Sequence, residues 1–180
     1  MRTTLFSLII LGLTAILLAF SISCFYGYFY PMRYSSEIRE VAKEYELEPA
    51  LIASMINVES SYKPERKSVK GAVGLMQLMP VTAEWLCKNL NIEYKEEALV
   101  EPKYNINLGG YYLSRLLKSF GNSQTALCAY NAGPTNVREW LKNTEYSEDG
   151  KTLKKIPFEE TRNYIQRVEK NLKYYRDRYK

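Results

Sequence analysis

Histidine is absent from this chain of 180 residues, and cysteine is scarce. Without histidine there is no Ser-His or Cys-His nucleophile system, and the common zinc sites lose a usual ligand. Cys24 lies in an apolar segment, while Cys87 and Cys128 lie in apolar helical contexts typical of small buried side chains. A disulfide between Cys87 and Cys128 stays open, because pairing depends on geometry. We expect no metal and no cofactor.

Charged residues are scarce at the N-terminal end: Arg2 is the only one there, and residues 3–32 contain none. Roughly 20 apolar residues suffice to cross a bilayer as a helix, whereas the apolar core of a cleaved signal peptide has about 7–15. The aromatic cluster at residues 25–30 is typical of a membrane interface. This predicts a transmembrane signal anchor over residues 1–32, followed by one domain over residues 33–180.

Other interpretations of this end stay open. Ser21 to Cys24 resembles a lipoprotein cleavage box, although Ser21 stands where Leu is usual. A cleaved leader is the remaining alternative. Lys and Arg on the two flanks of the apolar run do not decide its orientation.

Beyond residue 32, basic residues slightly outnumber acidic ones. A mildly basic surface suits a polyanionic neighbour such as a cell wall or a lipid headgroup. Lys and Arg are dispersed among Glu rather than clustered, so we expect no nucleic-acid partner.

The spacing of apolar residues is helical almost everywhere, which predicts an all-α fold. Ser36 is placed to cap a helix whose apolar face includes Ile38 and Val41. The other predicted helices cover residues 49–62, 80–90, 105–120, 123–131, 135–142 and 158–179. Gly121 and the Gly133–Pro134 pair are stop signals, and residues 143–155 form the expected exposed loop.

Glu59 occupies an unusual position in the predicted helix over residues 49–62. At about 100° per residue it projects into the apolar arc of Leu51, Ile52, Met55 and Ile56. Burying a lone carboxylate is costly. Either a salt bridge compensates the charge, or the site uses the altered proton affinity for chemistry.

Two further stretches place polar groups in apolar surroundings. In residues 68–80, Gly71 and Gly74 permit close backbone approach, and Gln77 stands among large apolar side chains. At residues 129–134, Tyr130 and Asn131 end a helix together. Both stretches indicate a groove lining; a tight connection packed with methionine and a plain helix terminus are the alternatives.

Together these motifs resemble the soluble lytic transglycosylase family, whose fold is the goose-type lysozyme fold. The matching segments are Glu-Ser at 59–60, Gly-Leu-Met-Gln-x-Met-Pro at 74–80, Ala-Tyr-Asn-Ala-Gly at 129–133 and Glu-Thr-Arg-x-Tyr at 160–164. The resemblance implies a compact, lysozyme-like helical domain with Glu59 as catalytic acid/base. It assigns substrate contacts to Ser68, Gln77, Met79, Tyr130, Asn131 and Glu160. Cys128 departs from the family pattern, where a small residue such as Ala is usual.

The implied reaction cleaves the β-1,4 bond between N-acetylmuramic acid and N-acetylglucosamine of peptidoglycan, leaving a 1,6-anhydromuramoyl end. Most glycoside hydrolases need two carboxylates, but these motifs supply one, and Glu65 and Glu101 lie in polar, loop-like contexts. The resemblance implies that the substrate acetamido group takes the second role. A hydrolytic muramidase on the same fold and a non-catalytic peptidoglycan-binding module are the alternatives.

Peptidoglycan lies outside the cytoplasmic membrane. We therefore expect a single-pass protein of the cell membrane, held by its N-terminal helix, with the domain on the extracytoplasmic side.

Overall fold

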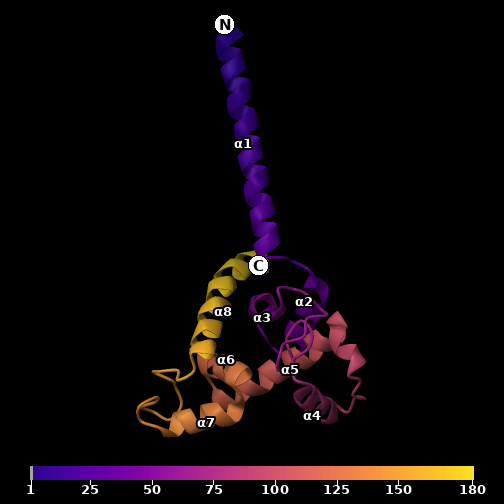
Figure 1. Ribbon diagram of the computed structural model, residues 1–180, viewed down its shortest axis with the longest axis vertical. Helices are drawn as coiled ribbons and strands as arrows, with labels where there is room; N and C mark the ends of the chain where they lie inside the picture. The colour runs from indigo at the N-terminus through magenta and orange to yellow at the C-terminus, as the bar shows by residue number, and fades with distance from the viewer. Residues whose placement is uncertain (1) are drawn as a thin grey trace. The chain divides into compact units, whose positions relative to one another are not determined.

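The computed structural model describes residues 2–180, with side chains at residue 6 and from residue 11 onward. The described residues form helices joined by turns and contain two isolated β-bridges but no strand, so the predicted all-α fold is confirmed. The chain divides into two compact units, one up to Met32 and one over Arg33–Lys180 (Figure 1).

The first unit contains the helix α1 (Arg2–Phe29). Within it, Leu11–Phe29 has a mean hydropathy of 1.7, which makes it long and apolar enough to cross a membrane by length and composition. At 1.5 Å per residue this stretch is roughly 28 Å long, close to the thickness of a bilayer's hydrocarbon core.

The second unit contains seven α-helices and one short 3₁₀ helix, η1, among the described residues. They are α2 (Ser35–Glu44), α3 (Pro49–Ser60), α4 (Pro80–Leu90), η1 (Glu97–Val100), α5 (Pro102–Phe120), α6 (Ser123–Ala132), α7 (Pro134–Lys142) and α8 (Glu159–Arg178). Each predicted helix is present, with ends shifted by at most three residues. The 3₁₀ helix was not predicted.

Proline and glycine set several of these boundaries. Proline begins α3, α4, α5 and α7, where the missing N–H would have no helical partner. Gly121 ends α5 and Gly133 ends α6, both at positive φ. The predicted cap at Ser36 is wrong: Tyr34 precedes α2 in the left-handed conformation, and the Ser36 hydroxyl donates to Glu37 instead.

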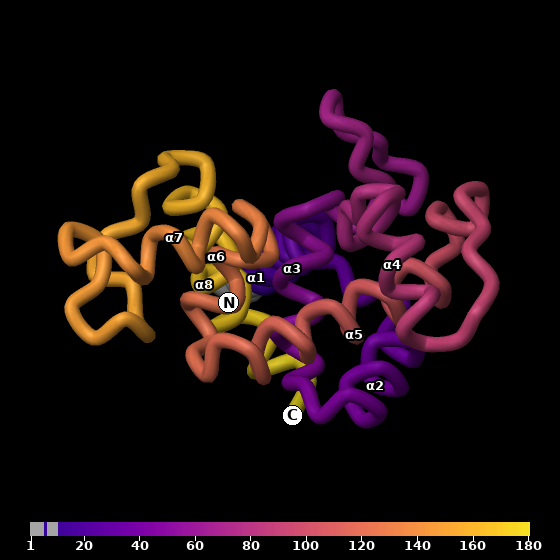
Figure 2. The backbone as a smooth tube through the Cα atoms, turned by 90° about the horizontal axis from the view of Figure 1, so that it is seen from below, coloured from indigo at the N-terminus to yellow at the C-terminus, as the bar shows by residue number. Residues whose placement is uncertain are grey.

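The core is built around α3, which packs most extensively against α8. Besides the predicted apolar arc, Ala53 and Val58 of α3 are also buried, so this helix is covered on nearly every side. Helix α5 crosses the unit from the α2 and α4 side to the α6 and α7 side (Figures 1 and 2). Cys87 and Cys128 are buried free thiols.

The loop over residues 61–79 joins α3 to α4 and is held by Asn105 of α5. The Asn105 side chain is fully buried, accepts from Met76 N at 2.7 Å, and donates to Val73 O at 3.1 Å and Leu99 O at 2.8 Å. Gly74 packs so closely against this amide that a Cβ atom would collide with it. The predicted close backbone approach at Gly74 is therefore present, and it fixes the shape of the loop.

Candidate active site

A cleft of about 360 Å³ opens where the end of α3, the 61–79 loop, the end of α6 and the start of α8 meet. We call it the Glu59 cleft. Its lining side chains include five of the predicted site residues: Glu59, Ser68, Gln77, Asn131 and Glu160. Val58, Arg66, Asn163, Tyr164 and Arg167 complete the lining. Segments almost 110 residues apart in sequence thus supply one site.

Glu59 lies in the last turn of α3, half-buried at the side of the cleft. Burial raises the pKa of its carboxyl from 4.5 to about 7. The Tyr164 hydroxyl and the charges of Arg167 and Arg66 oppose this rise, and Glu160 adds to it. A carboxyl with this pKa is substantially protonated near neutral pH, which suits a general acid.

The Tyr164 hydroxyl is buried beside Glu59. It has no hydrogen bond of good geometry to any described group, yet it is near enough to favour the charged form of the carboxyl. Burial and the Glu59 charge raise the pKa of Tyr164 well above its usual range, so the phenol keeps its proton. Tyr164 is therefore placed to donate a hydrogen bond to the Glu59 carboxylate when that group is ionised.

Gln77 and Ser68 belong to the 61–79 loop. Gln77 adopts a positive φ of 49°, an uncommon conformation for a residue with a side chain. Its amide nitrogen donates to Arg66 O at 2.9 Å and to Gly74 O at 2.8 Å. The Ser68 hydroxyl accepts from Ala72 N at 3.0 Å, and as a hydroxyl it keeps a proton to donate to a ligand.

Asn131 and Tyr130 lie at the end of α6. The Thr161 hydroxyl donates to the side-chain carbonyl oxygen of Asn131 at 2.8 Å. The amide nitrogen of Asn131 is therefore available to donate to a ligand. Tyr130 does not line the cleft itself: its hydroxyl donates to Met76 O at 2.9 Å. Burial, and after it the Glu59 charge, raise the pKa of Tyr130 well above its usual range, so this phenol keeps its proton.

Met79 and Glu160 lie at the margins. Met79 precedes α4, is 38% exposed, and is absent from the cleft lining. Glu160, in the first turn of α8, forms an exposed ion pair with Lys70 of the loop at 3.2 Å. Exposed pairs contribute about 0–1 kcal/mol, so this contact between the loop and α8 is weak enough for a ligand to replace.

Five lining residues were not predicted as site residues: Val58, Arg66, Asn163, Tyr164 and Arg167. Tyr164 could have been predicted from the sequence, because it is the last residue of the Glu-Thr-Arg-x-Tyr motif. Arg167 donates to Val58 O at 3.0 Å, tying α8 to the end of α3. No local pattern marks either arginine: Arg66 reaches the cleft through the fold of the loop that follows α3, and Arg167 through the packing of α8 against α3.

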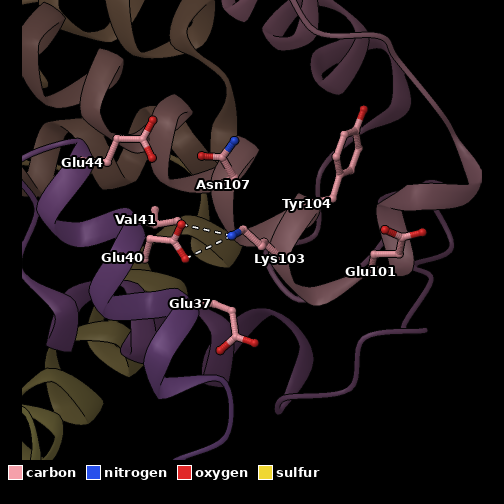
Figure 3. A pocket seen from close by; sticks show the side chains of 8 residues that line it. All are labelled: Glu37, Glu40, Val41, Glu44, Glu101, Lys103, Tyr104 and Asn107. Atoms are coloured by element: carbon pink, nitrogen blue, oxygen red, sulfur yellow. Dashed lines mark hydrogen bonds and ion pairs between the residues drawn. The ribbon is translucent and has the colours of Figure 1, made fainter.

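A second carboxylate-lined hollow of about 360 Å³ lies between α2 and the start of α5 (Figure 3). We call it the acidic pocket; Glu37, Glu40, Glu44 and Glu101 line it. Lys103 binds both oxygens of Glu40, at 3.1 and 3.3 Å, while the other three carboxylates stand apart (Figure 3). Nowhere among the described side chains do three or more His, Cys, Asp or Glu residues gather as a metal site.

A family model described as the transglycosylase SLT domain matches residues 36–153. The chain belongs to the transglycosylase SLT domain family. Its resemblance to lytic transglycosylases is thereby confirmed. The match ends before α8, so Glu160, Tyr164 and Arg167 lie outside the matched residues.

Relatives of this SLT domain include a soluble lytic murein transglycosylase of Salmonella typhimurium, 37% identical over 151 residues, covering 82% of this chain and 23% of that protein. A membrane-bound lytic murein transglycosylase C of Histophilus somni is 30% identical, covering 80% of this chain and 46% of that protein. The chain thus spans about a quarter of the length of the soluble relatives it matches.

Among solved structures, an inactive mutant of the lytic transglycosylase Slt from Pseudomonas aeruginosa superimposes with a TM-score of 0.76 at 34% identity. The superposition covers 85% of this chain and 25% of that one. The predicted lysozyme-like fold of the SLT family is confirmed.

Proposed function

We propose that this chain is a membrane-anchored lytic transglycosylase that cleaves the glycan strands of peptidoglycan and leaves 1,6-anhydromuramoyl ends. One observation carries the proposal: the Glu59 cleft holds a single half-buried carboxyl, with a pKa near 7, among side chains able to bind a polar ligand. The family and the names of the relatives support the same activity.

In the first step, protonated Glu59 donates its proton to the glycosidic oxygen, and the bond from that oxygen to C1 of the muramic sugar breaks. The carbonyl oxygen of the sugar's own acetamido group stabilises the positive charge that develops at C1. Burial favours this step because it keeps the acid protonated near neutral pH.

In the second step, the Glu59 carboxylate accepts the proton of the sugar's C6 hydroxyl as O6 bonds to C1. Glu59 ends protonated, as it began, and no water is consumed. Between the steps the carboxylate is ionised, and the Tyr164 hydroxyl together with Arg66 and Arg167 stabilises that charge. We assign Ser68, Gln77 and Asn131 to substrate contact within the cleft, Met79 and Glu160 to its margins, and Tyr130 to support of Glu59.

A hydrolytic muramidase is the second candidate, because Glu160 places another carboxylate in the same cleft. In a hydrolase that residue would activate water. Against this role, Glu160 is exposed and paired with Lys70. A non-catalytic binding module would have no use for an acid with the raised pKa of Glu59.

Mass spectrometry of the products from purified peptidoglycan separates these functions. The proposal expects muramic ends lighter by one water than the hydrated reducing ends that a muramidase leaves. Hydrated ends alone would establish the muramidase, and intact strands would leave only the binding module. Glu59→Gln serves as the matched inactive control.

The proposed anchor is an uncleaved, single-pass α1 with residues 33–180 on the extracytoplasmic side. Support comes from the apolar Leu11–Phe29 stretch and the membrane-bound relative. Protease added outside wall-free cells should digest residues 33–180 and spare the span, and the membrane form should begin at or near Met1. A lipid-modified Cys24 at the amino terminus, or a soluble form beginning beyond it, would contradict the uncleaved anchor.

A further inference from the structure

Another hollow, of about 550 Å³, lies on the surface formed by α4, α5 and α7. We call it the Trp85 pocket. Its lining includes Val81 and Trp85 from α4, Tyr112 and Arg115 from α5, and Pro134 and Arg138 from α7. Trp85 is 44% exposed and Val81 is 71% exposed, so the pocket presents apolar surface to solvent. Nothing in the proposed reaction uses these residues.

The Trp85 pocket adjoins the Glu59 cleft through two short pieces of chain. Gln77 of the cleft precedes Val81 of the pocket by four residues, and Asn131 precedes Pro134 by three. At about 3.5 Å per extended residue, either connection spans no more than about 14 Å. The linings of the two hollows therefore come within about 14 Å of each other at both places, a distance that about four extended residues of a side branch on a bound polymer can span.

Aromatic rings extend from the Trp85 pocket toward the 61–79 loop. The rings of Trp85 and Tyr112 lie 6.5 Å apart, edge to face, and the Tyr112 and Tyr130 rings lie 5.2 Å apart. The Tyr130 hydroxyl in turn donates to Met76 O of the 61–79 loop, the loop that supplies Ser68 and Gln77 to the Glu59 cleft. The pocket is thus connected to a wall of the cleft through packed rings and this hydrogen bond.

Two arginines give the pocket a positive charge that no described carboxylate neutralises. Arg115 lies over the Trp85 ring, 5.1 Å from its centre, and donates to the Tyr111 hydroxyl at 3.1 Å. Arg138 lies over the Phe120 ring at 5.5 Å. Two nearby glutamates pair with lysines instead: Glu84 with Lys88 at 2.9 Å, and Glu139 with Lys142 at 2.8 Å.

A ligand that matches this pocket carries a carboxylate on a partly apolar scaffold, because guanidinium groups bind carboxylates and an exposed tryptophan covers apolar atoms. The sugar rings of a peptidoglycan strand are uncharged, whereas its stem peptides carry free carboxylates and alanine methyl groups. We propose that the Trp85 pocket binds a carboxylate of the stem peptide of the strand held in the Glu59 cleft. This inference rests on the proposed function.

Direct binding tests the pocket without any turnover. The full chain in detergent, carrying Glu59→Gln, is titrated with a synthetic stem peptide bearing free carboxylates and with the same peptide fully amidated. Tryptophan fluorescence is the readout, since Trp85 is exposed and the other tryptophan, Trp140, is buried. We expect saturable binding of the free acid and binding at least tenfold weaker for the amide.

Arginine variants locate the site. Arg115→Gln and Arg138→Gln should each weaken peptide binding about tenfold. Arg178→Gln is the matched control, because Arg178 also lies over a tyrosine ring and bonds to its hydroxyl, but on α8. Circular dichroism melting of each variant checks the fold. Equal binding of acid and amide, or equal loss with the Arg178 variant, would overturn the proposal.

Cleavage assays then compare glycan strands that carry stems with strands stripped of them by an amidase. On the chain with Glu59 intact, Arg115→Gln and Arg138→Gln should lower kcat/KM on stem-bearing strands about tenfold and leave the stripped strands unaffected. Equal losses on both substrates would show that the pocket binds glycan and would overturn the stem-peptide assignment. If the unmodified chain cleaves neither substrate, the proposed function fails, and the peptide titration still decides the pocket.

Discussion

The Glu59 cleft and the acidic pocket have the same volume, about 360 Å³, but their carboxyl groups lie in different surroundings. The acidic pocket has four carboxylates at an open surface, with Glu40 held by Lys103 (Figure 3). In the Glu59 cleft a half-buried carboxyl has its proton affinity raised, and a buried phenol lies beside it. The difference teaches that burial and neighbours, rather than the number of carboxylates, raise the proton affinity of a carboxyl.

The largest expected effect is the loss of activity in Glu59→Gln. Removing a general acid typically costs about 100- to 10,000-fold, and we expect a loss at the upper end because Glu59 serves both steps. Release of anhydro ends from peptidoglycan is the measurement. Glu40→Gln in the acidic pocket is the control and should retain full activity. Equal losses in the two variants would abolish the distinction between the two hollows.

A comparable contrast holds for two asparagines of α5: Asn105 is buried and holds the 61–79 loop, whereas Asn107 lines the acidic pocket. Asn105→Ala leaves Met76 N, Val73 O and Leu99 O without their partner, so we expect the free energy of unfolding to fall by about 2–4 kcal/mol. Asn107→Ala removes one bond, from the Tyr45 hydroxyl at 2.7 Å, and should cost about 1 kcal/mol. Denaturant unfolding measures both; a smaller loss for Asn105 would show that the loop does not depend on this amide.

Tyr164→Phe sharpens the description of the acid. The Tyr164 hydroxyl lowers the pKa of Glu59, so its removal should raise that pKa further and move the falling limb of kcat/KM to higher pH. We also expect kcat to fall about 10- to 100-fold, because the ionised Glu59 loses a hydrogen-bond donor. A lower kcat with an unmoved limb would indicate a packing role for the ring alone.

The last predicted effect concerns the dependence of stability on pH. Because the folded pKa of Glu59 is about 7 against an ordinary 4.5, the folded state binds more protons between these values and loses stability as pH rises through them. Glu59→Gln should therefore be more stable than the unmodified chain above pH 7, by on the order of 3 kcal/mol. The advantage should shrink toward pH 4.5. Thermal melting across this range checks the sign, and a constant difference would contradict it.

Much of the fold could be predicted from the sequence, because proline and glycine mark the helix ends and the apolar spacing marks the helices. The burial of α3 on nearly every side could not, since it depends on α8, which is about 100 residues away in sequence. Capping by Ser36 failed because Tyr34 adopts a left-handed conformation that periodicity does not encode.

The residues of the candidate site were likewise predictable only in part. Glu59, Gln77, Asn131 and Glu160 stand in recognisable motifs and Ser68 begins the 68–80 stretch, and the structure brings all five into one cleft. The cations that oppose the rise of the Glu59 pKa carry no local signal, because the conformation of the 61–79 loop brings Arg66 to Glu59 and the packing of α8 brings Arg167. The roles of all these residues stay predictions.

The central claim is that burial keeps Glu59 protonated near neutral pH. Carbon NMR titration of selectively labelled glutamate carboxyls tests it directly, with Glu59→Gln and Glu40→Gln used to assign the resonances. We predict that the resonance missing from Glu59→Gln titrates near pH 7. Titration of that resonance at the ordinary glutamate value, about 4.3, would contradict the account.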